Sequence, residues 1–255
     1  MSKVLIEAFK SSGAMKFQYP PGSYLDISEF FYSTIQGEGV TTGKPAAFLR
    51  LQYCTLNCIW CDTAEVWRQG SRFFIKDLVK GLPAELVESL KNGASLVLTG
   101  GSPLRQQEGL VNFLKEFRES FGFLPFVEVE NEAVLEPVEE LVEMVSAWNN
   151  SPKLLNSGMK KNLRYKPELI RQLSSFENST FKFVITSGNS QKDIQEIEEF
   201  FLPLVKPSQI ILMPEGQTRD EIIENSPRVS ELAIERGWLF STRLHIILWN
   251  TKTGV

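Results

Sequence analysis

Short apolar runs alternate with longer amphipathic stretches along most of this chain. Runs rich in Val, Ile, Leu and Phe predict eight strands, at residues 26–35, 46–53, 95–99, 125–129, 144–148, 180–185, 209–213 and 244–249. Apolar positions spaced by three and four residues predict five helices, at residues 84–91, 107–121, 167–175, 191–201 and 219–236. Strands that alternate with helices are typical of a mostly parallel sheet covered by helices, so the predicted fold class is α/β.

Two of these elements are predicted from local detail. Thr218 precedes Glu221 by three residues, the spacing of a capping box, and Gly237 follows the last turn, so the helix over 219–236 is expected to begin and end there. The run from Leu244 to Trp249 is almost wholly apolar, which predicts a buried last strand. His245, the only histidine, is then expected to be a hydrogen-bonded core residue.

The chain shows no internal repeat and no long linker, which indicates one continuous domain. Residues 1–22, which end in Pro20-Pro21-Gly22, are expected to form an N-terminal extension, and residues 23–255 the domain. A chain of 255 residues can bury a sizeable core without disulfides.

Composition excludes several classes of protein. No apolar run approaches the ~20 residues that cross a bilayer, so no membrane protein is expected. The first apolar stretch, Val4-Leu5-Ile6, is too short for a signal peptide, and a cytoplasmic protein is expected. The net charge of −4 provides no basic field for a polyanion, which disfavours nucleic acid as a partner.

The three cysteines of the chain lie together, at Cys54, Cys58 and Cys61, in the spacing C-x3-C-x2-C. Three thiolates on one loop can hold three irons of a 4Fe-4S cluster and leave the fourth iron open to a ligand. Two other interpretations remain: three buried free cysteines, or a zinc site completed by His245.

This cysteine spacing between the first strands of an α/β chain resembles the radical S-adenosylmethionine (SAM) superfamily. The resemblance implies that the open iron binds the amino and carboxylate groups of SAM, and that one electron from the cluster cleaves SAM to a 5'-deoxyadenosyl radical. The radical then takes a hydrogen from the substrate.

Further segments resemble one family within it, 7-carboxy-7-deazaguanine synthase. They are Ile35-Gln36-Gly37-Glu38-Gly39, Phe48-Leu49-Arg50, Trp60-Cys61-Asp62-Thr63, Leu98-Thr99-Gly100-Gly101, Ser151-Pro152-Lys153 and Leu212-Met213-Pro214-Glu215-Gly216. The match runs from about residue 26 to residue 216 and continues toward the end of the chain. It implies a shortened, partly open (β/α) barrel and a homodimer.

The first two segments contain the expected substrate residues. Gln36 and Glu38 offer an amide and a carboxylate that suit the edge of a pterin ring, although an ordinary Gly-rich turn explains the segment equally well. Arg50 lies in an apolar strand and needs an anion, either a substrate carboxylate or a structural Asp or Glu. The resemblance adds Ile35, Gly37 and Thr99 to this substrate set.

Asp62 and Thr63 directly follow the last cysteine. The resemblance implies that the Thr63 hydroxyl coordinates a Mg2+ ion shared with the substrate carboxylate. Without the resemblance, the pair would be interpreted as a cap for the next segment.

The resemblance assigns SAM to residues at strand ends. The superfamily's Gly-Gly-Glu motif holds the SAM amino group; here Gly101 is followed by Ser102, a neutral residue that cannot form an ion pair with it. The remaining residues that the resemblance assigns to SAM are Trp60, Cys61, Asp62, Ser151, Pro152, Lys153, Met213, Pro214, Glu215 and Gly216.

The expected reaction converts 6-carboxy-5,6,7,8-tetrahydropterin to 7-carboxy-7-deazaguanine with loss of ammonia, a step toward queuosine and related 7-deazaguanines. The expected cofactors are a 4Fe-4S cluster, SAM and Mg2+, with a reducing electron donor such as a flavodoxin and with no protein general base. A glycyl-radical-activating enzyme shares the cysteine spacing, and a zinc-binding module without enzymatic activity is the second alternative.

Overall fold

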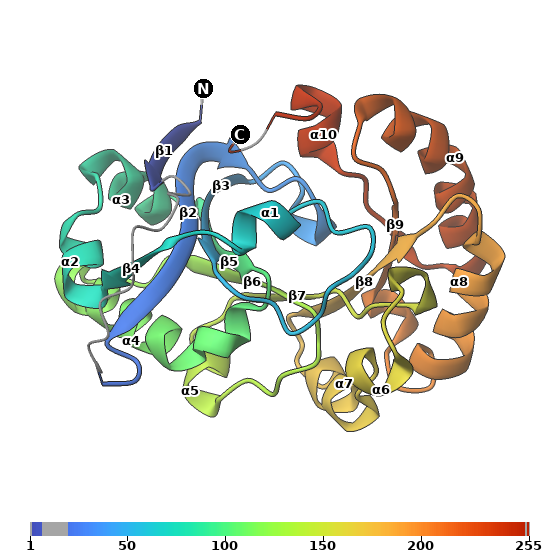
Figure 1. The fold of residues 1–255 in the computed structure, drawn as a ribbon, viewed down its shortest axis with the longest axis horizontal. Helices are drawn as coiled ribbons and strands as arrows, with labels where there is room; N and C mark the ends of the chain where they lie inside the picture. Colours follow the sequence, from blue (N-terminus) through green and yellow to red (C-terminus); the bar gives the residue numbers. More distant parts are fainter. Residues whose placement is uncertain (1, 7–19, 253, 255) are drawn as a thin grey trace.

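The computed structural model describes residues 2–6, 20–252 and 254, and within them ten strands form one sheet (Figure 1). The strands are β1 (Lys3–Ile6), β2 (Tyr24–Ile35), β3 (Pro45–Leu51), β4 (Ser71–Phe74), β5 (Ser95–Gly100), β6 (Phe126–Asn131), β7 (Ala147–Asn150), β8 (Ser179–Ile185), β9 (Ile210–Pro214) and β10 (Leu239–Phe240). Their order is β1-β2-β3-β5-β6-β7-β8-β9-β10, and β4 pairs with β2.

The sheet is parallel from β3 to β10, and β2 runs antiparallel to its neighbours β1, β3 and β4. The strand path ends at β10 without returning to its first strand, so the barrel is open. This arrangement confirms the predicted α/β class and the incomplete barrel.

The helices surround the curved sheet, most of them on its outside, while α1 lies within its curve (Figure 1). They are α1 (Ala64–Trp67), α2 (Ile75–Lys80), α3 (Ala84–Lys91), α4 (Gln107–Phe121), α5 (Glu139–Val142), α6 (Lys161–Arg164), α7 (Pro167–Ser174), α8 (Ser190–Glu196), which continues as a π-helix over Ile197–Phe201, α9 (Arg219–Arg236) and α10 (Leu244–Trp249). No helix among the described residues is long and apolar enough to cross a membrane.

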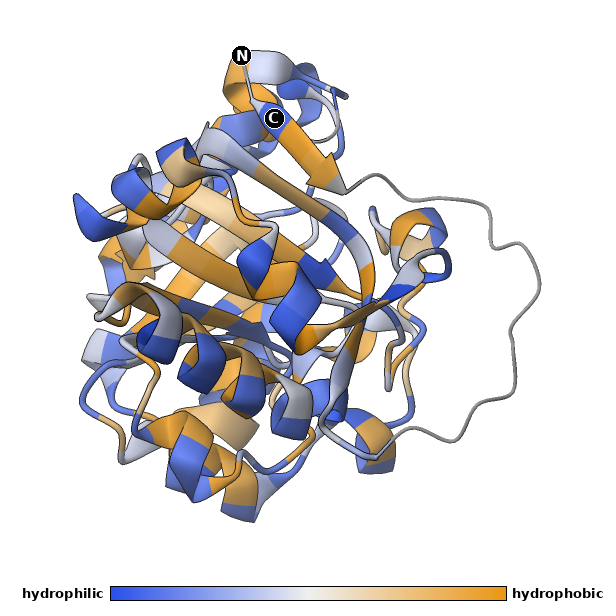
Figure 2. Cartoon of the chain, turned by 90° about the vertical axis from the view of Figure 1, so that its left-hand side faces the viewer, coloured by the Kyte–Doolittle hydropathy of each residue, from blue (hydrophilic) through white to orange (hydrophobic). Residues whose placement is uncertain are grey.

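Two apolar clusters form the core between the sheet and its helices (Figure 2). The first packs β2, β3, β5 and β6 against α2, α3 and α4, and includes Phe113 and Phe117, both fully buried. The second packs β8 and β9 against α7, α8 and α9, and includes Phe181, Phe183 and Phe201. Burying these side chains from both halves of the barrel fixes the positions of the strand ends.

The long helices agree closely with the sequence predictions. Those at 84–91, 107–121 and 219–236 have the predicted ends. Thr218 Oγ1 accepts from the Glu221 amide at 3.3 Å and Glu221 Oε2 accepts from the Thr218 amide at 3.1 Å, so the capping box is present. Gly237 adopts a φ of +66°, which confirms it as the stop.

The predicted last strand is wrong, because residues 244–249 form the short helix α10. The edge of β9 is already occupied by β10, and the Ser241 amide makes the last contact, to Leu212 O at 3.0 Å. The chain then turns across the strand ends, where the Leu244 amide donates to Gly37 O at 2.8 Å. Only Ile246 of this helix is fully buried, so its apolar residues cover the site instead of extending the sheet.

Part of the predicted N-terminal extension belongs to the sheet. Residues 3–6 form β1, which pairs antiparallel with β2, and Lys3 forms an ion pair with Glu85 at 2.5 Å. Residues 7–19, the larger part of that prediction, lie outside the described residues.

Candidate active site

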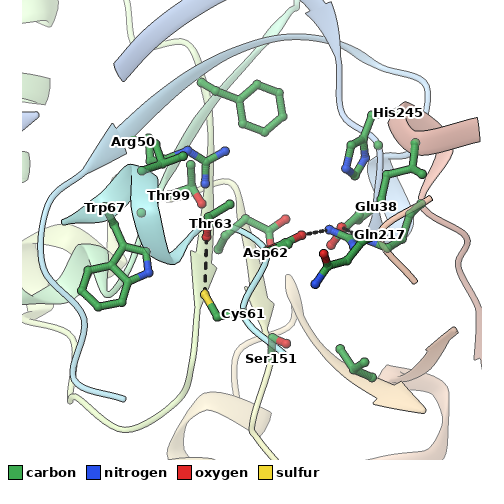
Figure 3. A pocket seen from close by; sticks show the side chains of 18 of the residues that line it. Glu38, Arg50, Cys61, Asp62, Thr63, Trp67, Thr99, Ser151, Gln217 and His245 are labelled. Atoms are coloured by element: carbon green, nitrogen blue, oxygen red, sulfur yellow. Dashed lines mark hydrogen bonds and ion pairs between the residues drawn. The ribbon is translucent and has the colours of Figure 1, made fainter. Parts of the chain in front are cut away.

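A cavity of about 450 Å³ opens at the carboxyl-terminal ends of the parallel strands (Figure 3). Ligands of open α/β sheets bind at this edge because the loops that follow the strands meet there. Every predicted site residue lines the cavity except Pro152, which is buried beside it: Ile35, Gln36, Gly37, Glu38, Arg50, Cys54, Cys58, Trp60, Cys61, Asp62, Thr63, Thr99, Gly101, Ser151, Lys153, Met213, Pro214, Glu215 and Gly216.

The loop with the three cysteines follows β3 and borders this cavity. All three cysteines are free and partly buried. The Leu56 amide donates to Cys54 Sγ at 3.4 Å and Ser102 Oγ donates to it at 3.7 Å, while the Ile59 amide donates to Ser157 O at 3.0 Å. The loop is therefore held by the segments that follow β5 and β7, with its sulfurs available to ligands.

Gly101, directly after β5, shows why a glycine is needed at this position. A Cβ at Gly101 would lie 2.3 Å from Tyr53 O and 2.6 Å from Cys54 Cβ, closer than any such contact allows. The backbone after β5 thus packs directly against the cysteine loop, a close approach that only glycine permits.

Burial raises the pKa of the Cys54 and Cys58 thiols above the ordinary value, although Lys153 opposes the rise at Cys58. Iron coordination deprotonates thiols outright, so a bound cluster would overcome this shift. Three free thiols on one loop, beside a cavity large enough for a further ligand, fit a 4Fe-4S cluster with one open iron.

Thr63 does not use its hydroxyl as a helix cap. It is the N-cap residue of α1, but its side chain makes no capping hydrogen bond, and its Oγ1 lies 3.8 Å from Cys61 Sγ. The hydroxyl faces the cavity beside Arg50 and Thr99 (Figure 3). The capping interpretation of Asp62 and Thr63 is therefore wrong, and the Thr63 oxygen is free to bind a cation.

Arg50 has a structural partner and also keeps part of its guanidinium available. Its Nε donates to Glu29 Oε1 at 2.7 Å, with both side chains less than a fifth exposed. The two terminal nitrogens have no partner among the described residues and lie at the cavity (Figure 3). Glu29 thus orients Arg50, and the free edge of the fork can still bind a carboxylate.

Glu38 and Gln36 take part in a buried polar network at the opposite wall. Lys182 Nζ donates to Glu38 at 2.5 Å and to Glu130 at 3.0 Å. Gln36 Nε2 donates to Glu128 Oε1 at 2.7 Å, so its amide group is already engaged. Burial raises the pKa of Glu38, but Lys182 and Arg243 outweigh it and lower the pKa well below its ordinary value, which keeps this carboxylate charged.

Arg243 joins the C-terminal segment to the cysteine loop. It donates to Glu38 Oε1 at 2.8 Å, to Gly216 O at 2.7 Å and to Asp62 Oδ2. Burial raises the pKa of Asp62, but Arg243 reverses this and lowers it. One guanidinium therefore links residues predicted to bind substrate and SAM.

Lys153 and Trp60 lie together at the SAM side of the cavity. Lys153 Nζ donates to Ser151 Oγ at 2.9 Å and lies 5.5 Å from the centre of the Trp60 ring. Trp60 Nε1 donates to Asn156 Oδ1 at 3.2 Å. Met213 to Gly216, at the end of β9, form the neighbouring wall, where burial raises the pKa of Glu215.

Several residues that line the cavity were not predicted to belong to the site: Glu130, Glu132, Lys182, Arg243 and His245. Lys182 could have been found, because a lysine in the apolar run Phe181 to Ile185 needs an anion as Arg50 does. His245 is not a core residue; it borders the cavity beside Gly37, and burial lowers its pKa. Nothing in the sequence near Arg243 indicates its contacts.

Comparisons with known proteins bear on this site. A family profile described as "4Fe-4S single cluster domain" matches residues 35–147, which include the three cysteines. The 7-carboxy-7-deazaguanine synthase of Pyrobaculum aerophilum is 32% identical over 88% of this chain and 94% of its own length. The chain belongs to the 7-carboxy-7-deazaguanine synthase family.

A second relative and a solved structure match the chain over a similar share of its length. The synthase of Halobacterium salinarum is 28% identical over 90% of this chain and 92% of its own length. The crystal structure of QueE from Escherichia coli matches with a TM-score of 0.61 at 22% identity, covering 87% of this chain and 95% of that one, which shows a shared fold.

Membership of the 7-carboxy-7-deazaguanine synthase family decides between the interpretations of the cysteine loop. The family is one of enzymes, so the chain is an enzyme and not a zinc-binding module, and a glycyl-radical-activating enzyme is no longer the alternative. The geometry agrees: His245, which a zinc site would require, lies beside Gly37 and Glu38, across the cavity from Cys61 (Figure 3).

Proposed function

We propose that this chain converts 6-carboxy-5,6,7,8-tetrahydropterin to 7-carboxy-7-deazaguanine with loss of ammonia, as a 7-carboxy-7-deazaguanine synthase that serves queuosine or 7-deazaguanine formation. The observation that carries the proposal is that the three-cysteine loop, Arg50 and Thr63 border one cavity at the strand ends. A cluster ligand set, a carboxylate site and a cation ligand thus lie within reach of one small molecule.

Cys54, Cys58 and Cys61 would hold the 4Fe-4S cluster. When bound, the cluster and SAM supply the radical that removes hydrogen from the substrate. Trp60, Asp62, Gly101, Ser151, Lys153 and the segment Met213 to Gly216 would surround SAM, and Pro152 would shape its loop from behind. The chain's own role is to position both molecules and exclude water.

Two groups would bind the substrate carboxylate. The free edge of the Arg50 guanidinium offers paired donors, which match a carboxylate's geometry. The Thr63 hydroxyl would contribute one ligand to a Mg2+ ion that also binds this carboxylate, since Mg2+ uses few protein ligands and retains waters. Thr99, between them, would contact the same end of the substrate.

The opposite wall would recognise the pterin ring. Ile35, Gly37 and His245 line it, together with Glu38 and Gln36 of the Lys182 network. Because Lys182 and Arg243 hold Glu38 in place, this carboxylate can present a fixed acceptor to ring N–H groups. No group in this wall is needed as a general base.

The proposal includes two protein partners. The chain has no cysteines beyond the three of the loop, so it holds no second cluster, and a reducing donor such as a flavodoxin would supply the electron. We also propose a homodimer, supported by the exposed apolar side chains of Leu239 and Phe240 in the edge strand β10 and of Ile234 on α9. Light scattering of the purified protein gives the mass directly.

The free thiols agree with a cytoplasmic location, where they stay reduced.

The direct test is an anaerobic assay of the reconstituted protein with dithionite, SAM, Mg2+ and 6-carboxytetrahydropterin, followed by mass spectrometry. We expect both 7-carboxy-7-deazaguanine and dependence on the cluster, which Cys58→Ala should abolish. If 5'-deoxyadenosine forms without that product, the cluster assignment stands and the substrate assignment fails. Activity retained in Cys58→Ala would overturn the cluster assignment itself.

A further inference from the structure

Glu132 is a buried carboxylate whose charge nothing in the described structure balances. It follows β6 directly, is 5% exposed and borders the cavity. Thr55 Oγ1 donates to its Oε1 at 2.6 Å, but its Oε2 is buried and has no hydrogen-bond partner among the described residues. A buried anion is costly to leave unpaired, so this oxygen indicates a missing cationic or hydrogen-bond-donating ligand.

The position of Glu132 indicates which ligand that is. Thr55 Oγ1 lies 2.8 Å from Ser102 Oγ, and Ser102 Oγ is 3.7 Å from Cys54 Sγ. Two hydroxyls therefore connect the Glu132 carboxylate to the sulfur of a cysteine proposed to bind the cluster. Glu132 also raises the pKa of Cys54, behind the larger effect of burial. Thiolates and a carboxylate repel each other, and a donor bound between them would relieve that repulsion.

Lys153, the cation whose charge acts on Cys58 of the cysteine loop, is otherwise engaged. Lys153 donates to Ser151 and lies over Trp60, and no ion pair joins any described cation to Glu132. Ser102, the residue after the two glycines, is neutral and donates to Cys54. The neighbouring parallel strand β6 thus supplies the carboxylate that the end of β5 lacks.

We propose that Glu132 binds the amino group of SAM through its unpartnered Oε2 and compensates for the neutral Ser102. The inference rests on the proposed function, because it takes the cluster on Cys54 and SAM as given. Glu132 would accept a charge-assisted hydrogen bond, while Thr55 and Ser102 fix the carboxylate's orientation. The assigned role belongs to cofactor binding, so it can be measured without substrate turnover.

The test is equilibrium dialysis of labelled SAM against the anaerobically reconstituted holoenzyme, without pterin. Glu132→Gln keeps the acceptor for Thr55 and removes only the charge, and we expect it to weaken SAM binding about 10- to 100-fold. Glu136→Gln, an exposed residue four positions along, is the matched control and should bind SAM like the wild type. Cluster content is checked in each sample by iron analysis and visible absorption.

A second arm identifies the chemical group that Glu132 contacts. S-adenosylhomocysteine is compared with its analogue that lacks the amino group. Loss of the amino group should weaken binding to the wild type at least ~10-fold more than to Glu132→Gln, because only the wild type loses the carboxylate contact. Equal losses in the two proteins would overturn the assignment.

Stability provides a readout that separates ligand binding from a structural role. Removing an unpaired buried charge should leave the thermal midpoint of the cluster-free Glu132→Gln protein unchanged or higher. A lower midpoint together with wild-type SAM affinity would show that Glu132 only supports the loop, and would overturn the inference. If wild-type holoenzyme fails to bind SAM at all, the proposed function fails first, and this inference with it.

Discussion

At the scale of single residues, Arg50 shows how one side chain satisfies a structural and a functional demand. The sequence offered either a structural acid or a substrate carboxylate as its partner, and the structure supplies the acid, Glu29, at the Nε side only. The terminal nitrogens stay at the cavity. Because a guanidinium is a fork with separate edges, one edge can be fixed by the protein while the other binds a ligand.

We therefore expect Arg50→Lys to raise the KM for the pterin substrate about 10- to 100-fold, since a lysine cannot pair with Glu29 and a carboxylate in the same geometry. SAM affinity should stay unchanged. Steady-state kinetics and dialysis of SAM measure the two effects. A KM equal to that of the wild type would remove Arg50 from the substrate site.

The Thr63 hydroxyl leads to a second prediction at this scale. It caps no helix and lies at the cavity, so Thr63→Val should retain the fold and lose the proposed metal ligand. We expect the Mg2+ concentration that half-activates the enzyme to rise about tenfold, as is typical when a contact in a metal site is lost. Thr63→Ser, which keeps the oxygen, is the control. The same Mg2+ response in all three proteins would contradict the assignment.

At the scale of elements, the long helices were predictable and the segments over the site were not. The helix over 219–236 carries its own start signals in Thr218 and Glu221 and its stop signal in Gly237, and these act within a few residues. Residues 244–249 carry an apolar run that fits a strand or a helix, and the tertiary contacts of Leu244 with Gly37 and of Arg243 with Glu38 decide in favour of a helix. Local signals fix local structure, whereas the covering segment depends on partners some 200 positions away.

The ion pairs of Arg243, at the start of α10, give a prediction for this element. Arg243→Gln leaves Asp62 without its ion-pair partner and leaves Glu38 with Lys182 alone, and we expect a loss of about 2 kcal/mol in the free energy of unfolding near neutral pH. Arg236→Gln, whose partners Glu198 and Glu235 are exposed, should cost less than about 1 kcal/mol.

The pH dependence of this loss follows from the two carboxyl pKa values. Both are lowered in the folded protein, so the stabilisation is present above their unfolded values of about 4 and disappears as the pH falls through the folded values. The unfolding curves of wild type and Arg243→Gln should thus approach each other in acid. A constant difference across that pH range would show that the lost contact is not an ion pair.

At the scale of the whole molecule, the predicted site residues gather because the strand order brings them together. Motif segments as far apart as residues 35 and 216 border one cavity, since each follows or ends a strand of the same sheet. The sequence could predict this from strand-end positions alone. It could not predict the contacts of Arg243 and Glu132 or the pairing of β1, because these arise only once the chain has folded.

The two ends of the described chain meet beside the cavity, which gives β1 a functional consequence (Figure 1). Ser2 Oγ donates to Gly254 O at 2.5 Å, and Gly254, with Thr251 and Lys252, lines the cavity. Ser2, directly before the edge strand β1, thus contacts a residue that lines the cavity on this side. Removal of β1 together with Ser2 should therefore affect the cavity, although they are far from it in sequence.

We expect deletion of residues 1–6 to raise the KM for the pterin about tenfold at a temperature where the truncated protein is fully folded, because Gly254 loses its contact with Ser2. Lys3→Gln is the matched control: it removes the ion pair with Glu85 but keeps the backbone pairing of β1 with β2, and its KM should equal that of the wild type. Steady-state kinetics measures KM, and circular dichroism verifies folding. If the deletion lowers only the thermal midpoint and leaves KM unchanged, β1 stabilises the sheet without shaping the site.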